Sequence, residues 1–305
     1  MNGVKDHIGV CVPTFKRPQL LGQLLQKLAR QQTHAQFRYS LHVVDNDCKR
    51  SAERTVAEFA RSVPLLVTYD VEPVQNISLA RNRAIRSAQG NFVAFIDDDE
   101  APPDNWLREL YVACRQHNAD GVLGPVKPFF EPGTPLWLKK SGLCDRPSHR
   151  TGTVLSHLQT RTGNVLFKRS ILDGVEVPFP IEMGNTGGED MDFFKWRISR
   201  GYVFVWCDEA PVYEIVTPDR YRRTYHLAKN LRIGGLTGEM VRGAASEKWR
   251  SLLRSVGSVL FHGPGTAATL PFGRHLYMKH SVKLAYHLGR ICGCLGFVPV
   301  RYRRP

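Results

Sequence analysis

The sequence predicts an α/β fold, in which a mostly parallel sheet is flanked by helices, followed by a basic helical region. Short apolar runs of strand length alternate with helical patterns over the first hundred residues, and this alternation favours parallel strands joined by right-handed crossovers. Acidic residues directly follow several of the apolar runs. In open α/β sheets the carboxyl ends of the strands form the edge where ligands bind, so these acids mark a candidate site.

The first strand and the first helix have the clearest patterns. Residues 8–12 form a continuous apolar run, which is typical of a strand buried on both faces. Pro18 suits the first turn of a helix. Leucines then recur at positions 20, 21, 24, 25 and 28, the spacing of an apolar stripe packed on a sheet. We therefore expect a strand, a turn and a helix that covers the sheet.

The remaining elements continue this alternation. Further strands are expected at residues 41–45, 65–69, 91–96, 121–124, 165–168 and 202–207, the last of them the final clear strand. Further helices are expected at about residues 51–61, 78–88, 105–117 and 190–200. Residues 125–147 are rich in proline, glycine and aromatic residues, which predicts a long loop of the kind that often serves as a lid or binding loop.

Charge divides the 305-residue chain into two parts. Up to residue 219 there are 26 Lys and Arg against 26 Asp and Glu, whereas residues 220–305 hold 16 against 2. The C-terminal region therefore accounts for the whole formal net charge of +14. Such a region suits the phosphates of nucleic acid or the anionic lipids of a membrane surface.

The apolar content of this region favours the membrane surface, and we expect no nucleic acid partner. Nineteen uncharged residues separate Arg254 from Arg274, and a second apolar stretch covers residues 291–300. Glycine and proline interrupt the first stretch and the second is too short, so neither is expected to span a membrane. Basic residues interleaved with aliphatic stretches fit a membrane interface; a solvated basic face on ordinary helices is the alternative.

The start of the chain predicts a cytoplasmic protein. Residues 1–7 are polar and the next apolar run has only strand length, which does not resemble a secretory leader. The seven cysteines are scattered, as expected of reduced thiols in the cytoplasm. Together with the basic region, this predicts a peripheral location at the inner face of the cell membrane.

Three acidic clusters carry the candidate chemistry. They are Asp45 with Asp47, the run Asp97–Glu100, and Glu189 with Asp190 and Asp192. A D-x-D pair can hold Mg²⁺ or Mn²⁺ against substrate phosphates, because these hard cations prefer oxygen ligands. An acidic surface turn is the structural alternative for the second cluster, and a helix N-terminus that favours acids is the alternative for the third.

Five ordered segments together resemble family 2 glycosyltransferases. They are VCVPTFKRP (10–18), VVDND (43–47), NISLARN (76–82), FIDDD (95–99) and GGED (187–190). The resemblance covers about residues 8–220. Within the family, the chain looks most like the bacterial transferases that build succinoglycan-type exopolysaccharide on a lipid carrier.

The resemblance implies the GT-A fold over residues 1–219, with a nucleotide half at about 1–100 and an acceptor half at about 101–219. Residues 220–305 are then a basic, partly apolar, membrane-associating region. The implied reaction moves one sugar from a nucleotide-sugar donor, a UDP-hexose such as UDP-glucose, to a hydroxyl of a lipid-linked oligosaccharide. The reaction inverts the configuration at the anomeric carbon and depends on Mg²⁺ or Mn²⁺. The Q-x-x-R-W signature of processive synthases is missing, which favours single addition.

The resemblance also implies roles for individual residues. Those expected to bind the nucleotide are Pro13, Thr14, Asp45, Asp47, Arg81 and Asp97, with Asp45 or Asp47 at the base. Asp97 and Asp99 are the expected metal ligands, Asp99 the more direct of the two, and Asp98 and Gly188 are expected near the donor sugar. Asp190 matches the catalytic base, while Glu189 and Trp137 are expected to bind the acceptor.

One position departs from the family pattern. Relatives often have a histidine where this chain has Tyr213, and that histidine can supply a further metal ligand. Glu214, water or His226 are the alternatives for this chain.

Two other functions would each explain part of the sequence. A nucleotidyltransferase that makes a nucleotide sugar should have a glycine-rich basic loop after the first strand, but residues 12–18 contain Lys16 and Arg17 without a glycine. A nucleic-acid-binding protein would explain the basic region, yet it leaves the D-x-D run and residues 187–192 without a role.

Overall fold

The computed structural model describes residues 5–185, 187–243 and 245–297. The chain forms two compact units: Met1–Lys127 with Arg146–Ile215, and Pro128–Asp145 with Val216–Pro305. The second unit therefore takes in residues 128–145, which the sequence had placed with the acceptor half.

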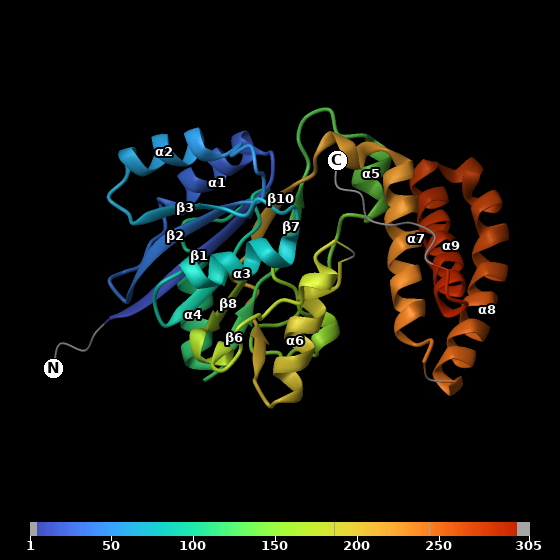
Figure 1. Ribbon diagram of the computed structural model, residues 1–305. Helices are drawn as coiled ribbons and strands as arrows, with labels where there is room; N and C mark the ends of the chain where they lie inside the picture. Colours follow the sequence, from blue (N-terminus) through green and yellow to red (C-terminus); the bar gives the residue numbers. More distant parts are fainter. Residues whose placement is uncertain (1–4, 186, 244, 298–305) are drawn as a thin grey trace. The chain divides into compact units, whose positions relative to one another are not determined.

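The first unit is built on a seven-stranded sheet (Figure 1). In spatial order the strands are β3 (Val67–Val71), β2 (Phe37–Asp45), β1 (Asp6–Thr14), β4 (Phe92–Phe95), β8 (Val165–Lys168), β6 (Gly121–Leu123) and β9 (Phe204–Trp206). The first four run parallel, β8 is antiparallel to both of its neighbours, and β9 is parallel to β6. The predicted mostly parallel sheet is confirmed.

Helices cover both faces of this sheet. One hydrophobic core packs under α1 (Pro18–Leu28), α2 (Glu53–Ser62) and α4 (Trp106–Gln116), and the other under α3 (Ile77–Ser87) and α6 (Glu189–Ser199). Strand β1 supplies both cores in alternation, since Val10 and Val12 belong to the first and Cys11 to the second. This period of two is the pleat of a strand. In the leucine stripe of α1, Leu21, Leu24, Leu25 and Leu28 are buried as predicted, whereas Leu20 is partly exposed.

Several short elements differ from the sequence-based expectation. The predicted loop at residues 125–147 contains β7 (Val126–Phe129) and α5 (Leu136–Ser141), and β10 (Val212–Ile215) follows the strand expected to be the last. The strands β7 and β10 form a three-stranded sheet together with β5 (Glu100–Ala101), in the order β5-β10-β7. These elements have two to six residues, and Glu, Lys or Pro interrupts their apolar residues, so they show neither a period nor the continuous apolar run that marked other short strands.

The second unit contains the helices α7 (Arg223–Met240), α8 (Ala245–Thr269) and α9 (Arg274–Cys294), and α9 packs against both others (Figure 1). Glycines bring α7 and α9 to backbone distance. A Cβ added at Gly234 or Gly238 would lie 1.9 or 2.2 Å from a carbonyl oxygen of α9. One added at Gly289 or Gly293 would lie 1.9 or 2.0 Å from a carbonyl oxygen of α7. We call this contact the α7–α9 seam; at these four positions it leaves no room for a side chain.

Helix α8 runs without interruption through Gly257, Gly263, Pro264 and Gly265. These glycines and the proline therefore interrupt the apolar stretch in composition without breaking the helix. Gly265 is needed where α9 approaches, because an added Cβ would lie 2.4 Å from the ring of His280. Within the described ranges, no helix is both long and apolar enough to cross a membrane. Residues 298–300 of the second predicted apolar stretch lie outside the described residues.

Candidate active site

The acidic run lies at the carboxyl edge of the sheet, directly after β4. Thr14 ends the neighbouring strand β1, and its hydroxyl donates a hydrogen bond of 2.7 Å to Asp98. Arg17, in the turn after β1, donates from Nη1 to Asp98 at 3.1 Å and to Asp99 at 3.0 Å. Two of the five predicted segments therefore meet at this edge, and Pro13 lies buried in β1 beside Thr14.

Negative charge accumulates at this edge. Burial raises the pKa of Asp99 to about 7, and the charges of Asp97, Asp98 and Glu214 add to the increase. Burial, followed by the charge of Asp97, also raises the pKa of Glu100 well above its usual value. Ionised carboxylates this close repel one another unless a cation is present, so the edge is suited to a cation.

The donor set fits a hard divalent cation. Asp97 and Asp99 supply carboxylate oxygens, the ligands that Mg²⁺ and Mn²⁺ prefer. In the part of the chain that the structure describes, no group of three or more His, Cys, Asp or Glu residues is arranged to hold a metal ion. A cation bound here would take its other ligands from substrate phosphates and water, as Mg²⁺ commonly does.

Among the alternatives for a further ligand, Glu214 belongs to the same unit as the acidic run. Its Oε2 accepts a hydrogen bond of 2.8 Å from Arg146 Nη2. Tyr213 precedes it and is 40% exposed. His226 belongs to the second unit, where its Nε2 lies 2.8 Å from the carbonyl oxygen of Arg220. Among these alternatives, Glu214 is the residue whose charge acts on Asp99.

A loop that the sequence did not single out packs against the acidic run. It comprises residues 160–164, just before β8. A Cβ added at Gly163 would lie 3.1 Å from Asp97 Oδ2 and 3.0 Å from Glu100 Oε1. Asn164, with a φ of 57°, fixes the loop through three hydrogen bonds to other elements. The available signal was a Gly-Asn pair before an apolar run, a turn pattern too common to mark a site.

Arg81 and Glu189 form a buried ion pair. Arg81 Nη1 lies 2.5 Å from Glu189 Oε1, and both side chains are 8% exposed. The pair joins α3 to the first residue of α6, and so connects segments expected to bind the nucleotide and the acceptor. Among the described residues, Arg81 Nε and Glu189 Oε2 have no hydrogen-bond partner. Each residue therefore retains one buried polar atom for a ligand.

Asparagines of the NISLARN segment hold the chain that leads to α6. Asn76 caps the N-terminus of α3, and its Nδ2 donates to the carbonyl oxygen of Ile181 at 2.8 Å. Asn82 donates to the carbonyl oxygen of Phe179 and accepts from the N–H of the same residue. These contacts fix the approach to Gly188, the N-cap of α6, and they were not predicted from the sequence.

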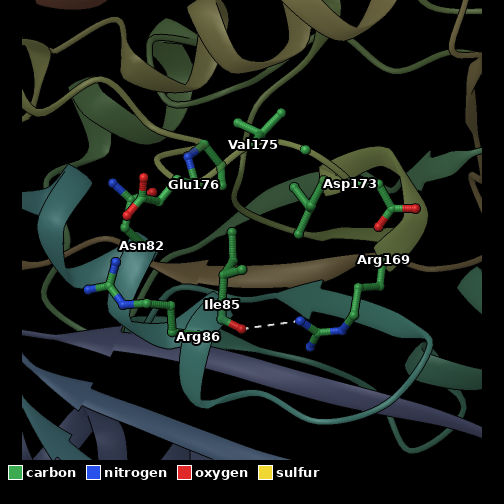
Figure 2. A pocket seen from close by; sticks show the side chains of 10 residues that line it. Asn82, Ile85, Arg86, Arg169, Asp173, Val175 and Glu176 are labelled. Carbon is green, nitrogen blue, oxygen red and sulfur yellow. Dashed lines mark hydrogen bonds between the residues drawn. The ribbon is translucent and has the colours of Figure 1, made fainter.

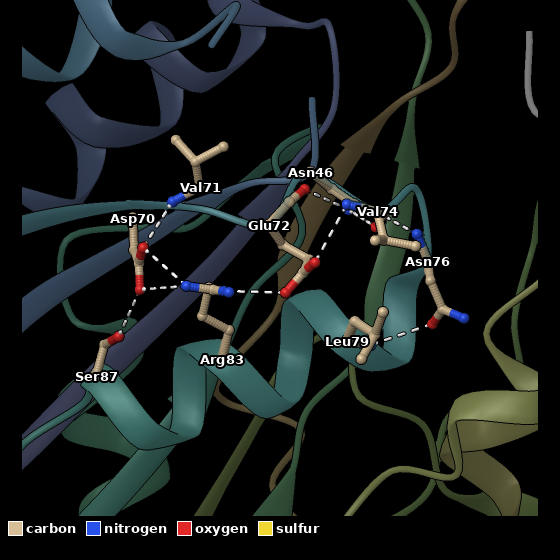
Figure 3. Close-up of polar contacts among 9 residues, drawn as sticks. All are labelled: Asn46, Asp70, Val71, Glu72, Val74, Asn76, Leu79, Arg83 and Ser87. Atoms are coloured by element: carbon tan, nitrogen blue, oxygen red, sulfur yellow. Dashed lines mark hydrogen bonds and ion pairs between the residues drawn. The ribbon is translucent and has the colours of Figure 1, made fainter. Parts of the chain in front are cut away.

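Asn46 connects the end of β2 to the start of α3 (Figure 3). Its Nδ2 donates to the carbonyl oxygens of Glu72 at 3.0 Å and Val74 at 2.6 Å. Its Oδ1 accepts from the N–H of Asn76 at 2.9 Å. Figure 3 also shows Arg83 on α3 paired with Glu72 at 3.0 Å. Asn46 is therefore a positioning residue for the helix that carries Arg81.

The aspartates on either side of Asn46 have different surroundings. Asp45 is fully buried, and its carboxylate accepts hydrogen bonds from the backbone N–H groups of Asp47 and Ala52 and from the hydroxyl of Tyr69. The Asp47 carboxylate accepts one hydrogen bond from the described residues, donated by the N–H of Lys49. Asp45 therefore stabilises its own loop, and Asp47 is the better placed of the two to contact a base.

Asp190 is the second residue of α6. The helix starts after Gly187 and Gly188, whose φ angles of 86° and 103° lie in the left-handed region that favours glycine. The Asp190 side chain is partly exposed, and its Oδ1 accepts the N–H of Met191 at 2.8 Å. Unpaired N–H groups at a helix N-terminus stabilise a carboxylate. The arrangement presents an accessible carboxylate next to Glu189 of the Arg81–Glu189 pair.

Trp137 lies on α5 in the second unit. Its ring meets that of His226 edge-on, with centroids 5.9 Å apart. Its contact with the acceptor stays a prediction.

Figure 2 shows a cavity of about 530 Å³ between α3 and the chain that follows β8. Arg169 lines it, and its guanidinium donates to the carbonyl oxygens of Ile85, Ala88 and Gly90. Arg169 therefore caps the C-terminal end of α3. Because the acidic run does not line this cavity, we do not assign the nucleotide to it.

Comparisons with known proteins agree with this geometry. The family described as "Glycosyl transferase family 2" matches residues 9–175. The chain is 31% identical over 297 residues to the succinoglycan biosynthesis protein ExoM of Rhizobium meliloti (strain 1021), an alignment that covers 95% of this chain and 93% of that protein.

Solved structures share the fold. A mannosyltransferase from Pyrobaculum calidifontis, in complex with GDP-Man and Mn²⁺, matches with a TM-score of 0.63 at 17% identity, over 94% of this chain and 88% of that one. Staphylococcus aureus TarS 1–349, in complex with UDP-GlcNAc, matches with a TM-score of 0.54 at 16% identity, over 96% and 93%. The fold is GT-A, and the chain belongs to glycosyltransferase family 2.

Proposed function

We propose that this enzyme moves one sugar from a UDP-hexose, such as UDP-glucose, to a hydroxyl of a lipid-linked oligosaccharide in bacterial cell-surface polysaccharide synthesis. The observation that carries the proposal is the buried acidic run, bonded to Thr14 and Arg17 at the carboxyl edge of the sheet. The name of the Rhizobium relative supports a role in exopolysaccharide assembly. The UDP-GlcNAc and GDP-Man complexes of fold neighbours support a nucleotide-sugar donor.

The donor is assigned to the edge around the acidic run. In this proposal the residues that contact the nucleotide are Pro13, Thr14, Asp47 and Arg81, and those near the donor sugar are Asp98 and Gly188. Asp97 and Asp99 hold Mg²⁺ or Mn²⁺, which stabilises the negative charge that develops on the leaving diphosphate. Arg17 keeps Asp98 and Asp99 in place through its two hydrogen bonds.

Asp190 is the proposed catalytic base. Inversion by direct displacement requires one carboxylate, on the face of the sugar opposite the leaving group, to accept the proton of the acceptor hydroxyl. Asp190 is accessible and lies at a helix N-terminus. Glu189, held by Arg81 through Oε1, presents Oε2 to the acceptor and orients it.

Asp99→Ala should remove the metal dependence of nucleotide binding. Because Asp99 supplies a carboxylate oxygen to the cation, we expect wild-type protein to bind UDP at least about ten times more tightly with Mn²⁺ than with a chelator. The variant should bind UDP with the same affinity under both conditions. Isothermal titration calorimetry measures this. Glu58→Ala, at an exposed position of α2, should behave as wild type. An undiminished Mn²⁺ effect in Asp99→Ala would show that another residue holds the metal.

One face of α8 is apolar and exposed; we call it the α8 stripe. Its side chains, spaced four, three and four residues apart and 46% to 72% exposed, are Trp249, Leu253, Val256 and Leu260. Basic residues border it at positions 248, 250 and 254. A helix with this pattern lies on anionic lipid, and residues 220–305 carry the complementary charge. We propose that the α8 stripe docks on the inner face of the cell membrane, where a lipid-linked acceptor is found.

Leu253→Glu/Leu260→Glu should release the protein from anionic vesicles. Each leucine contributes about 1.5 kcal/mol or more when it leaves water, so the double variant should lose at least about tenfold in partitioning. Co-flotation with vesicles rich in phosphatidylglycerol measures this. Leu66→Glu, an exposed leucine of the first unit, is the matched control. If the double variant floats as wild type does, another surface binds the membrane.

A further inference from the structure

Arg161 is a partly buried cation near the candidate active site. It belongs to the loop that packs against the acidic run, two residues before Gly163. Among the described residues, none forms a hydrogen bond or ion pair with its guanidinium. None of its guanidinium nitrogens is among the buried unpartnered atoms of the described residues, so they reach solvent, where a guanidinium in a candidate active site can bind an anionic ligand.

A second cation lies beside it. Arg146 is 29% exposed and its Nη2 binds Glu214 at 2.8 Å. Burial and the charge of Arg146 lower the pKa of Arg161, while the charges of Glu100, Asp190 and Glu214 raise it. Glu214 pairs with Glu100 in the β10–β5 register, and a Cβ at Gly163 would lie 3.0 Å from Glu100, so Arg146 and the loop that carries Arg161 both lie at the end of the acidic run.

We propose that Arg161, together with Arg146, binds a diphosphate group of the substrate next to Asp190. This inference rests on the proposed function. A guanidinium that only neutralised the neighbouring acids would hydrogen-bond to one of them, as Arg146 does to Glu214. Arginine stays charged and presents a planar fork of donors that matches phosphate oxygens. Thr162, the next residue, adds a buried hydroxyl without a partner among the described residues.

The diphosphate has two possible sources, the nucleotide-sugar donor and the lipid-linked acceptor. Calorimetry with UDP, UMP and GDP, and kinetics with a membrane extract as acceptor source, separate them in Arg161→Ala and Arg161→Lys. If the donor is bound, Arg161→Ala lowers the affinity for UDP about tenfold to a hundredfold and leaves that for UMP unchanged. If the acceptor is bound, affinity for UDP is unchanged and the KM for acceptor rises by a similar factor, with kcat retained.

Arg161→Lys should recover only part of the loss, because an ammonium lacks the fork. Arg150→Ala, at an exposed arginine of the same stretch, should match wild type. Unchanged UDP affinity together with unchanged acceptor KM in Arg161→Ala overturns the inference. A lower unfolding midpoint of Arg161→Ala than of wild type also overturns it, because Arg161 would then stabilise the fold. Absence of both UDP and GDP binding in wild type would instead refute the proposed function.

Discussion

Asp190→Asn should lower sugar transfer by about 10²- to 10⁴-fold, the usual contribution of a general base, while UDP binding stays as in wild type. The amide keeps the shape of the side chain and its contact with the N–H of Met191, but it accepts no proton. Single-turnover transfer, measured alongside calorimetry with UDP, separates the two properties.

Asp192→Asn is the matched control, since Asp192 lies on the same first turn of α6 and is also partly exposed. It should retain transfer within a small factor of wild type. An equal loss of UDP affinity in Asp190→Asn would mean that Asp190 binds the donor, and equal activity losses in the two variants would mean that helix charge alone matters.

Arg81→Met should destabilise the first unit by about 3–5 kcal/mol, the usual effect of leaving one member of a buried ion pair without its partner. Glu189 is 8% exposed and holds Arg81 Nη1 at 2.5 Å, so its carboxylate would remain buried and unpaired. Methionine fills much of the volume of the arginine stem, which limits the effect of an empty cavity. Urea unfolding at neutral pH gives the free energy.

The double variant Arg81→Met/Glu189→Gln should recover part of this loss, because the buried charge is removed together with its partner. Arg54→Met serves as the comparison, since it breaks the fully exposed Arg54–Glu58 pair on α2, and should leave the unfolding curve unchanged. A double variant no more stable than Arg81→Met would show that the ion pair is not the source of the effect.

Periodicity explains which parts of the fold were predictable. The run at residues 8–12 and the leucines of α1 extend over enough residues for a period to appear, and both pack as expected. β5 and α5 have two and six residues, too few for any period. The apolar pair Leu65–Leu66 also suggested a strand start two residues before β3 begins at Val67.

The parts of the candidate site that consist of consecutive residues could be predicted, as in the acidic run and in Gly188–Asp190. Contacts between distant segments were not. Nothing local shows that Arg81 will meet Glu189, which is 108 positions away, or that Gly163 will pack on Asp97. The same holds for Asp45, whose burial and hydrogen bonds depend on how its loop closes.

The α7–α9 seam limits how this unit can change by mutation. In an ordinary core, a larger side chain on one helix can be offset by a smaller one on the other. At Gly234 and Gly289 the facing atoms are backbone carbonyl oxygens, each 1.9 Å from where a Cβ would be, and no residue is smaller than glycine. A single added methyl group therefore has no compensating substitution. The exposed residues of α8 face no such restriction, so the chemistry of this exposed face can diverge while the helical frame behind it cannot.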